Sequence, residues 1–246
     1  MPAPNAGTGW NAFCTASLDV LFPQTCAFCR QVCNPAPGFP GICRQCLALL
    51  PIRSVKRIKP LQIDPLLSSE IPGTDIYCLA YYQGALRQAL LRFKFGDAPD
   101  LAAALAALLV QQICQAGLNP AAVAAVPLHK SRLRERGYNQ AQLLASQIAQ
   151  QLELPDWSGF LCRSRATCRQ SEQVSREERV TNLRHAFSLA PGSPIRPTEA
   201  FAHPQAKPVL LIDDVLTTGV TMIEAARPFW AAGQPVAGLV IASNHL

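Results

Sequence analysis

The sequence VLLIDDVLTTGVTM, residues 209–222, joins a short apolar run to two adjacent carboxylates and a Thr-Thr-Gly turn. The apolar residues 208–212 predict a buried strand, and a helix is expected from about residue 218. In an α/β sheet, ligands bind beyond the carboxyl ends of the strands, where a loop leads into a helix. The stretch therefore predicts a ligand-binding site at the end of this strand.

Two kinds of chemistry meet in this stretch. Backbone N–H groups and hydroxyls at a helix N-terminus bind phosphate, and the residues expected to do so are Thr217, Thr218, Gly219 and Thr221. Asp213 and Asp214 would repel a phosphate, but carboxylates accept hydrogen bonds from sugar hydroxyls. The pattern fits a ribose 5-phosphate, with its phosphate on the threonine loop (residues 217–221) and its 2- and 3-hydroxyls on the aspartates. The alternative, an aspartate that caps a threonine turn, leaves the second aspartate unexplained.

From residue 76 onward, strand and helix patterns alternate along the chain. The predicted strands are 76–83, 121–127, 160–164, 208–212 and 235–243. The predicted helices are 100–116, 139–152 and the one from about 218, while 84–96 fits either a helix or a hairpin. Continuous apolar strands that alternate with helices are typical of a parallel sheet covered on both faces. The expected fold class is therefore α/β.

Four cysteines form two C-x2-C pairs, Cys26 with Cys29 and Cys43 with Cys46. Each pair can present two thiolates to one metal ion from a tight turn, and two pairs complete a tetrahedral four-sulfur zinc site. Such a site leaves no open coordination position, so we expect a structural zinc. The alternative is four unrelated buried cysteines. Cys33 is an alternative ligand, although a free thiol is its expected state.

The proline-rich residues 51–75 predict a linker with little regular structure. They separate a zinc-ribbon-like module at 24–50 from a larger domain at 76–246, and an N-terminal helix is expected within residues 1–23. The N-terminus lacks the features of a signal peptide, and the strongest apolar run, 101–110, is too short to span a bilayer. We therefore expect a cytoplasmic protein whose ten cysteines are thiols or metal ligands rather than disulfides.

Composition and charge narrow the range of partners. Apolar residues make up 49% of the 246 residues and charged ones 15%, which indicates a substantial core and argues against wholesale disorder. The net charge is +6, and the excess of Lys and Arg lies in residues 1–60 and 125–185. A polyanion such as single-stranded DNA is therefore expected to meet those two regions, the first through Arg53, Lys56 and Arg57.

Three blocks of the sequence match known motifs. The stretch 209–222 resembles the phosphoribosyl-pyrophosphate (PRPP) signature of type I phosphoribosyltransferases. Residues 126–145, VPLHKSRLRERGYNQAQLLA, resemble the Pro-x-His … Arg-Gly-Phe-Asn-Gln block of the ComF competence-protein family. Residues 165–187, RATCRQSEQVSREERVTNLRHAF, resemble its Thr-x-x-Gln … Arg-x-x-Asn … Phe block. Paired C-x2-C motifs before a phosphoribosyltransferase-like domain are also the architecture of that family, and the resemblance covers residues 20–246.

The resemblance implies a type I phosphoribosyltransferase-like fold that binds PRPP together with Mg2+. The magnesium would bridge the pyrophosphate and the ribose hydroxyls and keep several waters. The pyrophosphate would lie on the loop after the strand 121–127, where the expected residues are Leu128, His129, Lys130, Arg134 and Arg136. A structural role fits His129 equally well, and residues 130–136 also fit a solvent-facing helix.

The polar, arginine-rich segment 163–184 is interpreted as a cover over the site. Its expected ligand-facing residues are Gln170, Arg176, Arg179 and Asn182. An ordinary solvent-facing helix at 175–185 is the alternative. In phosphoribosyl transfer the anomeric carbon ionises as pyrophosphate leaves, so positioning and charge stabilisation suffice and no dedicated base is needed.

Three functions are compatible with the sequence. The first is a ComF-type PRPP-binding protein that assists DNA uptake, transformation or the use of DNA in the cytoplasm, together with other DNA-uptake proteins. The second is a nucleotide-salvage phosphoribosyltransferase, and the third is a PRPP-sensing regulator without transfer chemistry. The zinc module and the N-terminal basic block favour the first. The sequence identifies neither an acceptor nor a catalytic residue, so it does not decide whether a transfer reaction occurs.

Overall fold

The structure is a computed structural model that describes residues 23–58, 74–96, 98–163, 186–193, 195 and 206–244, with residues 53–58 described by their backbone. Two expectations lie outside the described residues. They are the N-terminal helix, which falls on residues before 23, and the cover residues Gln170, Arg176, Arg179 and Asn182. Within the described part of the chain, no helix is long and apolar enough to cross a membrane.

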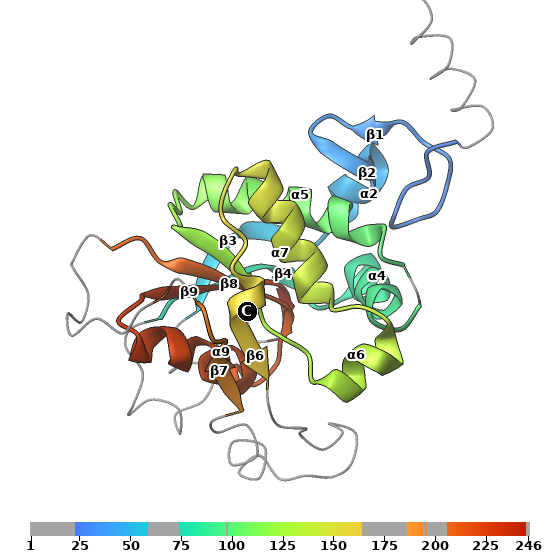
Figure 1. Cartoon of the computed structure of the whole chain (residues 1–246). Helices are drawn as coiled ribbons and strands as arrows, with labels where there is room; N and C mark the ends of the chain where they lie inside the picture. The colour runs from blue at the N-terminus through green and yellow to red at the C-terminus, as the bar shows by residue number, and fades with distance from the viewer. Residues whose placement is uncertain are drawn as a thin grey trace, which may run out of the picture.

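A five-stranded sheet lies at the centre of the molecule, in the order β3-β4-β9-β8-β5 (Figure 1). Its strands are β3 (Ile52–Ile58), β4 (Ile76–Tyr81), β5 (Ala122–Ala125), β8 (Val209–Leu216) and β9 (Val236–Ser243). The strands β4, β9, β8 and β5 run parallel, and β3 is added antiparallel to β4. The predicted α/β class is confirmed, with an antiparallel edge strand that the sequence pattern did not predict.

Helices cover both faces of this sheet because alternate residues of its strands point to opposite sides. The helices are α4 (Gly84–Phe95), α5 (Leu101–Gln115), α6 (Lys130–Arg136), α7 (Gln140–Gln151) and α9 (Val220–Ala231). In β8, Leu210 and Ile212 pack in a core cluster with α4, α5 and α7. Val209 and Leu211 pack in a second cluster, with α9. The region 84–96 is therefore a helix and not a hairpin.

A separate two-stranded antiparallel sheet joins β6 (Leu161–Arg163) to β7 (Phe187–Leu189). The strand predicted at 160–164 exists as β6, but it pairs with β7 instead of joining the main sheet. A 3-10 turn at Ser158–Phe160 leads into β6. Leu161 and Phe187 are buried in the same cluster as α9, which holds the β6–β7 pair on that face of the main sheet.

Within the predicted linker 51–75, residues 52–58 form the strand β3, which corrects the prediction of little regular structure for that part, and residues 59–73 lie outside the described residues. The strand residues Ile52–Ile58 pair with the outer edge of β4, where Lys56 lies opposite Cys78. The prolines Pro51 and Pro60 flank the strand rather than interrupt it, so a count of prolines was misleading. The paired edge of β4 supplies the hydrogen-bond partners that order the segment, and no local pattern reports such a partner.

The strand β8 is longer than the predicted 208–212. It extends from Val209 to Leu216, so Asp213 and Asp214 belong to the strand, and Asp213 lies opposite Val240 of β9. The reason is that β9 continues to pair with β8 as far as Leu216. The two carboxylates therefore stand on a backbone that neighbouring strands hold in place.

The cysteine module, residues 24–50, packs against the main core. Its elements are β1 (Pro35–Ala36), β2 (Phe39–Cys43) and α2 (Arg44–Leu49). Cys26, Phe28 and Ile42 are buried in the same cluster as α4 and α5, and β2 contacts α5. Figure 1 shows the module at one end of the molecule, next to α5. A segment of this size is too small to form a hydrophobic core by itself, so the apolar residues of the module pack against α5.

Candidate functional site

Asp213 and Asp214 lie beside the end of β5. Ala125 of β5 pairs with Ile212 of β8, and the N–H of Val126 donates to the carbonyl of Ile212 at 2.9 Å. Because the two strands are parallel, the loop after β5 and the two aspartates lie together at the carboxyl ends of the strands. The structure thus brings together the segments that the sequence predicts for the sugar and for the pyrophosphate.

The two carboxylates have different partners. Asp214 is buried, and its Oδ1 forms an ion pair with Nζ of Lys94 at 3.0 Å. Asp213 is partly buried, and its Oδ1 accepts a hydrogen bond from the N–H of Asp214 at 2.8 Å. Lys94 comes from the last turn of α4, far from β8 in sequence. The site therefore includes a cation that the sequence reasoning missed.

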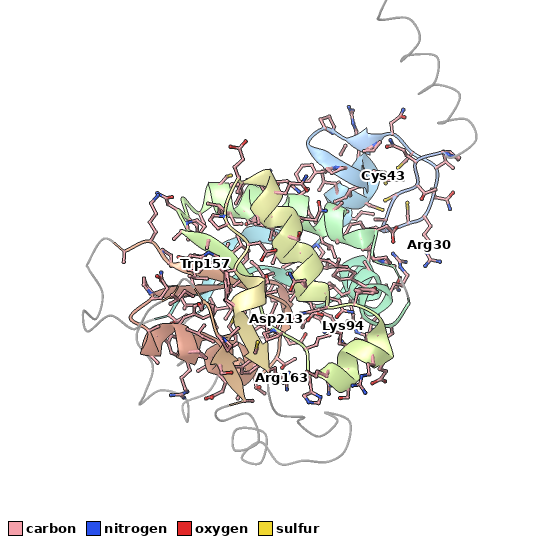
Figure 2. All side chains as sticks on the ribbon, in the orientation of Figure 1. Arg30, Cys43, Lys94, Trp157, Arg163 and Asp213 are labelled. Atoms are coloured by element: carbon pink, nitrogen blue, oxygen red, sulfur yellow. The ribbon has the colours of Figure 1, made fainter. Side chains whose placement is uncertain are left out.

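A second cation, Arg163, acts on Asp213 from β6. Its guanidinium lies over the ring of Phe187 in β7, 5.3 Å from the ring centroid. Burial and the charge of Arg132 lower the pKa of Arg163, while the charge of Asp213 raises it. Figure 2 shows Lys94, Arg163 and Asp213 in one region, on α4, β6 and β8. Cations from two distant elements thus offset the negative charge of the aspartates.

The Asp213 carboxyl titrates in an unusual range. Burial raises its pKa to about 7, and the charge of Asp214 acts in the same direction. The charges of Lys94 and Arg163 and the hydrogen bond from the N–H of Asp214 act in the opposite direction. Near neutral pH the carboxyl therefore exchanges between its ionised form, which only accepts hydrogen bonds, and its protonated form, which also donates one.

The threonine loop joins β8 to α9 through a residue with left-handed backbone. Gly219 has a φ of 71° and is the N-cap residue of α9. A side chain would be strained in this conformation, and glycine avoids that cost. Because Gly219 offers no side chain to cap α9, the N–H groups of the first turn are left for another acceptor. Thr217 is exposed, while Thr218 and Thr221 are partly exposed.

In the loop after β5, His129 caps a helix. It is the N-cap residue of α6, and its Nδ1 lies 3.2 Å from the backbone nitrogen of Ser131 and 2.8 Å from Ser131 Oγ. Leu128 is half-buried just before it. Of the two roles that the sequence leaves open for His129, this geometry supports capping.

The three basic residues of α6 that the sequence predicts for the pyrophosphate divide into two groups. Arg136 donates to Oε1 of Gln140 at 3.3 Å, and its guanidinium lies 5.1 Å from the ring centroid of Phe95. Lys130 and Arg134 are exposed at the surface. An anion beside the loop therefore finds Lys130 and Arg134 more accessible than Arg136.

The four predicted zinc ligands converge on one point. The sulfur atoms of Cys26, Cys29, Cys43 and Cys46 all lie within 4.8 Å of one another. The sulfurs of Cys29 and Cys43 are 3.9 Å apart. Zn–S bonds of about 2.3 Å place sulfurs at roughly 3.8 Å in a tetrahedron. The Cys29–Cys43 separation matches that geometry, and the cluster offers the ligand type of a structural zinc site.

Backbone N–H groups donate hydrogen bonds to two of the four thiols, and at Cys26 they favour the thiolate. Sγ of Cys26 accepts from the N–H of Cys43 at 3.4 Å, and Sγ of Cys43 accepts from the N–H of Cys46 at 3.3 Å. Burial raises the pKa of Cys26, but hydrogen bonds from backbone N–H groups outweigh it and bring the pKa down to about 6. Cys33 lies outside the cluster, and burial and the neighbouring thiolates raise its pKa. Cys33 therefore fits the expected free thiol.

Comparison with known proteins gives a consistent set of relatives. Competence protein F of Haemophilus influenzae is 33% identical over 166 residues, which cover 65% of this chain and 69% of that protein. DNA utilization protein YhgH of Salmonella typhimurium is 31% identical over 218 residues, which cover 83% of this chain and 90% of that protein. The YhgH protein of Escherichia coli K12 is 30% identical over 220 residues, with the same coverage. The chain belongs to the ComF family.

No protein-family model matches this ComF-family chain. Among solved structures, adenine phosphoribosyltransferase from Leishmania donovani is similar with a TM-score of 0.39 and 16% identity. That similarity covers 69% of the ComF-family chain and 84% of the phosphoribosyltransferase.

Lys94 and Arg163 carry little signal in the sequence of this ComF-family protein. Lys94 occupies the last turn of a helix, where a basic side chain is common because it interacts favourably with the helix dipole. Arg163 ends a short strand whose partner, β7, follows only after residue 186. Both residues become site residues through tertiary placement alone.

Proposed function

We propose that this ComF-family protein binds PRPP together with Mg2+ at the end of β8. The observation that carries the proposal is the succession of two strand-borne aspartates, a left-handed glycine and an uncapped helix N-terminus. The ribose hydroxyls would donate to Asp213 and Asp214, and the 5-phosphate would accept from the threonine loop. Lys94 and Arg163 would offset the negative charge that gathers at the site.

Magnesium fits the chemistry of this donor set. It takes oxygen ligands and keeps several waters, and the site offers the carboxylate oxygens of Asp213 and Asp214 next to the place proposed for the sugar. When bound, the ion would neutralise charge on the leaving pyrophosphate. The chain itself would hold the sugar on β8 and the phosphate on the first turn of α9.

We propose a structural zinc in the cysteine module. The closed set of four sulfur ligands, Cys26, Cys29, Cys43 and Cys46, leaves no position for a substrate. The module shares its core with α5, so the metal would stabilise more than the knuckles themselves.

We further propose a role in DNA uptake or in the use of incoming DNA in the cytoplasm. The relatives are named competence protein F and DNA utilization protein, which favours this role over nucleotide salvage. The exposed Lys130 and Arg134 lie in the second basic region, where single-stranded DNA is expected to bind. PRPP and DNA would then bind close to each other, near the carboxyl ends of β5 and β8.

Thermal unfolding tests the ligand. PRPP with Mg2+ is expected to raise the melting temperature, because a ligand that binds only the folded state stabilises it. The double variant Asp213→Asn/Asp214→Asn should lose this shift, and Asp100→Asn, an exposed carboxylate before α5, should keep it. If the double variant keeps the shift, the sugar lies elsewhere.

Product identification tests the reaction. The protein is incubated with PRPP, Mg2+ and a panel of nucleobases or single-stranded DNA, and the products are identified by mass spectrometry. Pyrophosphate release that depends on a nucleobase would favour salvage. Tight PRPP binding without turnover would favour a PRPP sensor. DNA that carries a phosphoribosyl group would favour the DNA role.

A further inference from the structure

Successive residues in the last turn of α4 contact different parts of the molecule. Arg92 reaches the cysteine module, Phe93 the start of α7, Lys94 the carboxylate of Asp214 and Phe95 the end of α6. Figure 1 shows α4 between the cysteine module and α6. One helical turn therefore touches both the cysteine module and the proposed PRPP site.

Arg92 fastens this turn to the first cysteine knuckle. Its Nη2 donates to the carbonyl of Ala27 at 2.6 Å and to that of Phe28 at 3.1 Å. These two residues separate the metal-ligand candidates Cys26 and Cys29. Hydrogen bonds from a guanidinium are stronger than neutral ones, and Arg92 is partly buried. In the closed knuckle both carbonyls face one nitrogen of Arg92.

The other side of the turn is also fixed. The carbonyl of Phe93 accepts hydrogen bonds from Oη of Tyr138 at 2.7 Å and from Nε2 of Gln140 at 3.0 Å. Carbonyls in the last turn of a helix lack partners within the helix, so they depend on such contacts. Lys94 follows directly and forms its 3.0 Å ion pair with Asp214. The position of its ammonium group thus depends on contacts at both neighbours in the chain.

We propose that the cysteine module anchors the last turn of α4 and thereby sets Lys94, a positioning residue, against Asp214. The proposal rests on PRPP binding and on the zinc site. Through its ion pair, Lys94 holds the Asp214 carboxylate in place for a sugar hydroxyl, and its positive charge reduces repulsion between the carboxylates and an anionic ligand. Loss of the metal would open the knuckle, remove the acceptors of Arg92 and loosen this turn.

Ligand titration tests the proposal on the zinc-loaded full chain. Arg92→Met and Lys94→Met should each weaken PRPP binding in Mg2+ by at least about 5-fold, the lower end of common coupling between sites. The zinc content should stay at one per chain in both variants. Lys94→Arg should restore most of the affinity, which a merely structural role would not predict. Arg87→Met, an exposed arginine on the same helix, should bind like wild type.

A double variant separates the anchor from an independent effect. Because Arg92 acts through Lys94, Arg92→Met/Lys94→Met should bind no more weakly than Lys94→Met alone. Additive losses, or wild-type affinity in Arg92→Met, would overturn the anchor. Wild-type affinity in Lys94→Met would overturn the positioning role.

Amide hydrogen exchange gives a readout that needs no ligand. Removing zinc from the wild type should lower protection in the last turn of α4, and Arg92→Met should show the same loss with zinc still bound. Arg92→Lys keeps the charge but has a shorter side chain, so its protection should lie between that of the wild type and that of Arg92→Met. Unchanged protection in Arg92→Met overturns the anchor even if PRPP binds. Absence of PRPP binding in the wild type would instead refute the proposed function, and the exchange result would still decide the anchor.

Discussion

At the scale of single residues, Asp213 links the site to pH. Burial and the charge of Asp214 raise its pKa to about 7 in the folded protein, against the opposing charges of Lys94 and Arg163. In an unfolded chain the pKa of an aspartate is about 4. Between these values the folded state holds a proton that the unfolded state has lost. Stability contributed by this group is therefore full below about pH 4 and is lost as the pH rises toward about 7.

We expect Asp213→Asn to remove this dependence on pH. The free energy of unfolding of the wild type should fall relative to that of the variant between about pH 5 and about pH 8. Urea denaturation of both proteins at the two pH values measures the difference, and Asp100→Asn serves as the exposed control. Identical pH dependence in wild type and Asp213→Asn would show that the carboxyl titrates normally.

Gly219 gives a second prediction at this scale. Its φ of 71° disfavours any side chain, so Gly219→Val should strain the loop by about 1–3 kcal/mol and remove measurable PRPP binding. Thr217→Ala deletes one exposed hydroxyl and should cost roughly 1 kcal/mol in binding. Isothermal titration compares the two variants. Wild-type affinity in Gly219→Val would mean that the loop is only a structural turn.

At the scale of elements, apolar runs and periodicity predicted α5, α7 and α9 and the parallel strands. Those patterns are local: β5 and β9 are continuous apolar runs, and α7 follows helical spacing. The spacing of the C-x2-C pairs likewise predicted the converging cysteine cluster. The sheet pairings that were missed are pairings at a distance. Neither β3 on the edge of β4 nor the pairing of β6 with β7 follows from the strand's own residues.

The candidate site divides in the same way. The aspartates and the threonine loop are contiguous in sequence, so a motif predicts them. Lys94 and Arg163 lie more than forty residues from Asp213 in the printed sequence, and only folding brings their charges to it. A sequence pattern can therefore predict the groups that would touch a ligand but not the groups that set their charge state.

The cysteine module gives a prediction for an element. Cys26→Ser and Cys43→Ser should each lose zinc and destabilise residues 24–50, because structural zinc contributes directly to folding. Since Cys26 and Phe28 share a core cluster with α5, reduced protection should extend to the contact between β2 and α5. Metal analysis and hydrogen exchange measure the two effects, with Cys162→Ser, an exposed cysteine, as the control. A metal-free wild type with full protection would contradict the zinc proposal.

At the scale of the whole molecule, charge predicts a partner. Single-stranded DNA should bind weakly through the two basic regions, and binding should weaken steeply with salt as counterions are released. Reversal of Arg53, Lys56 and Arg57 to glutamate in the edge strand β3 should reduce DNA binding and leave PRPP binding unchanged. Lys207→Glu, an exposed lysine outside those regions, is the control. Fluorescence anisotropy at several salt concentrations measures both, and salt-independent binding would refute the electrostatic basis.

The sheet order has a consequence for how the protein forms during synthesis. The strand β9, the last in chain order among the described strands, lies in the sheet between β4 and β8. On the ribosome, β4 emerges long before its parallel neighbour β9, and the backbone groups on that edge stay unpaired until more than a hundred and fifty further residues have been translated. Sheets closed by such distant pairings form slowly and expose unpaired edges meanwhile. Nascent chains that stall before β9 should therefore be strong substrates for chaperones.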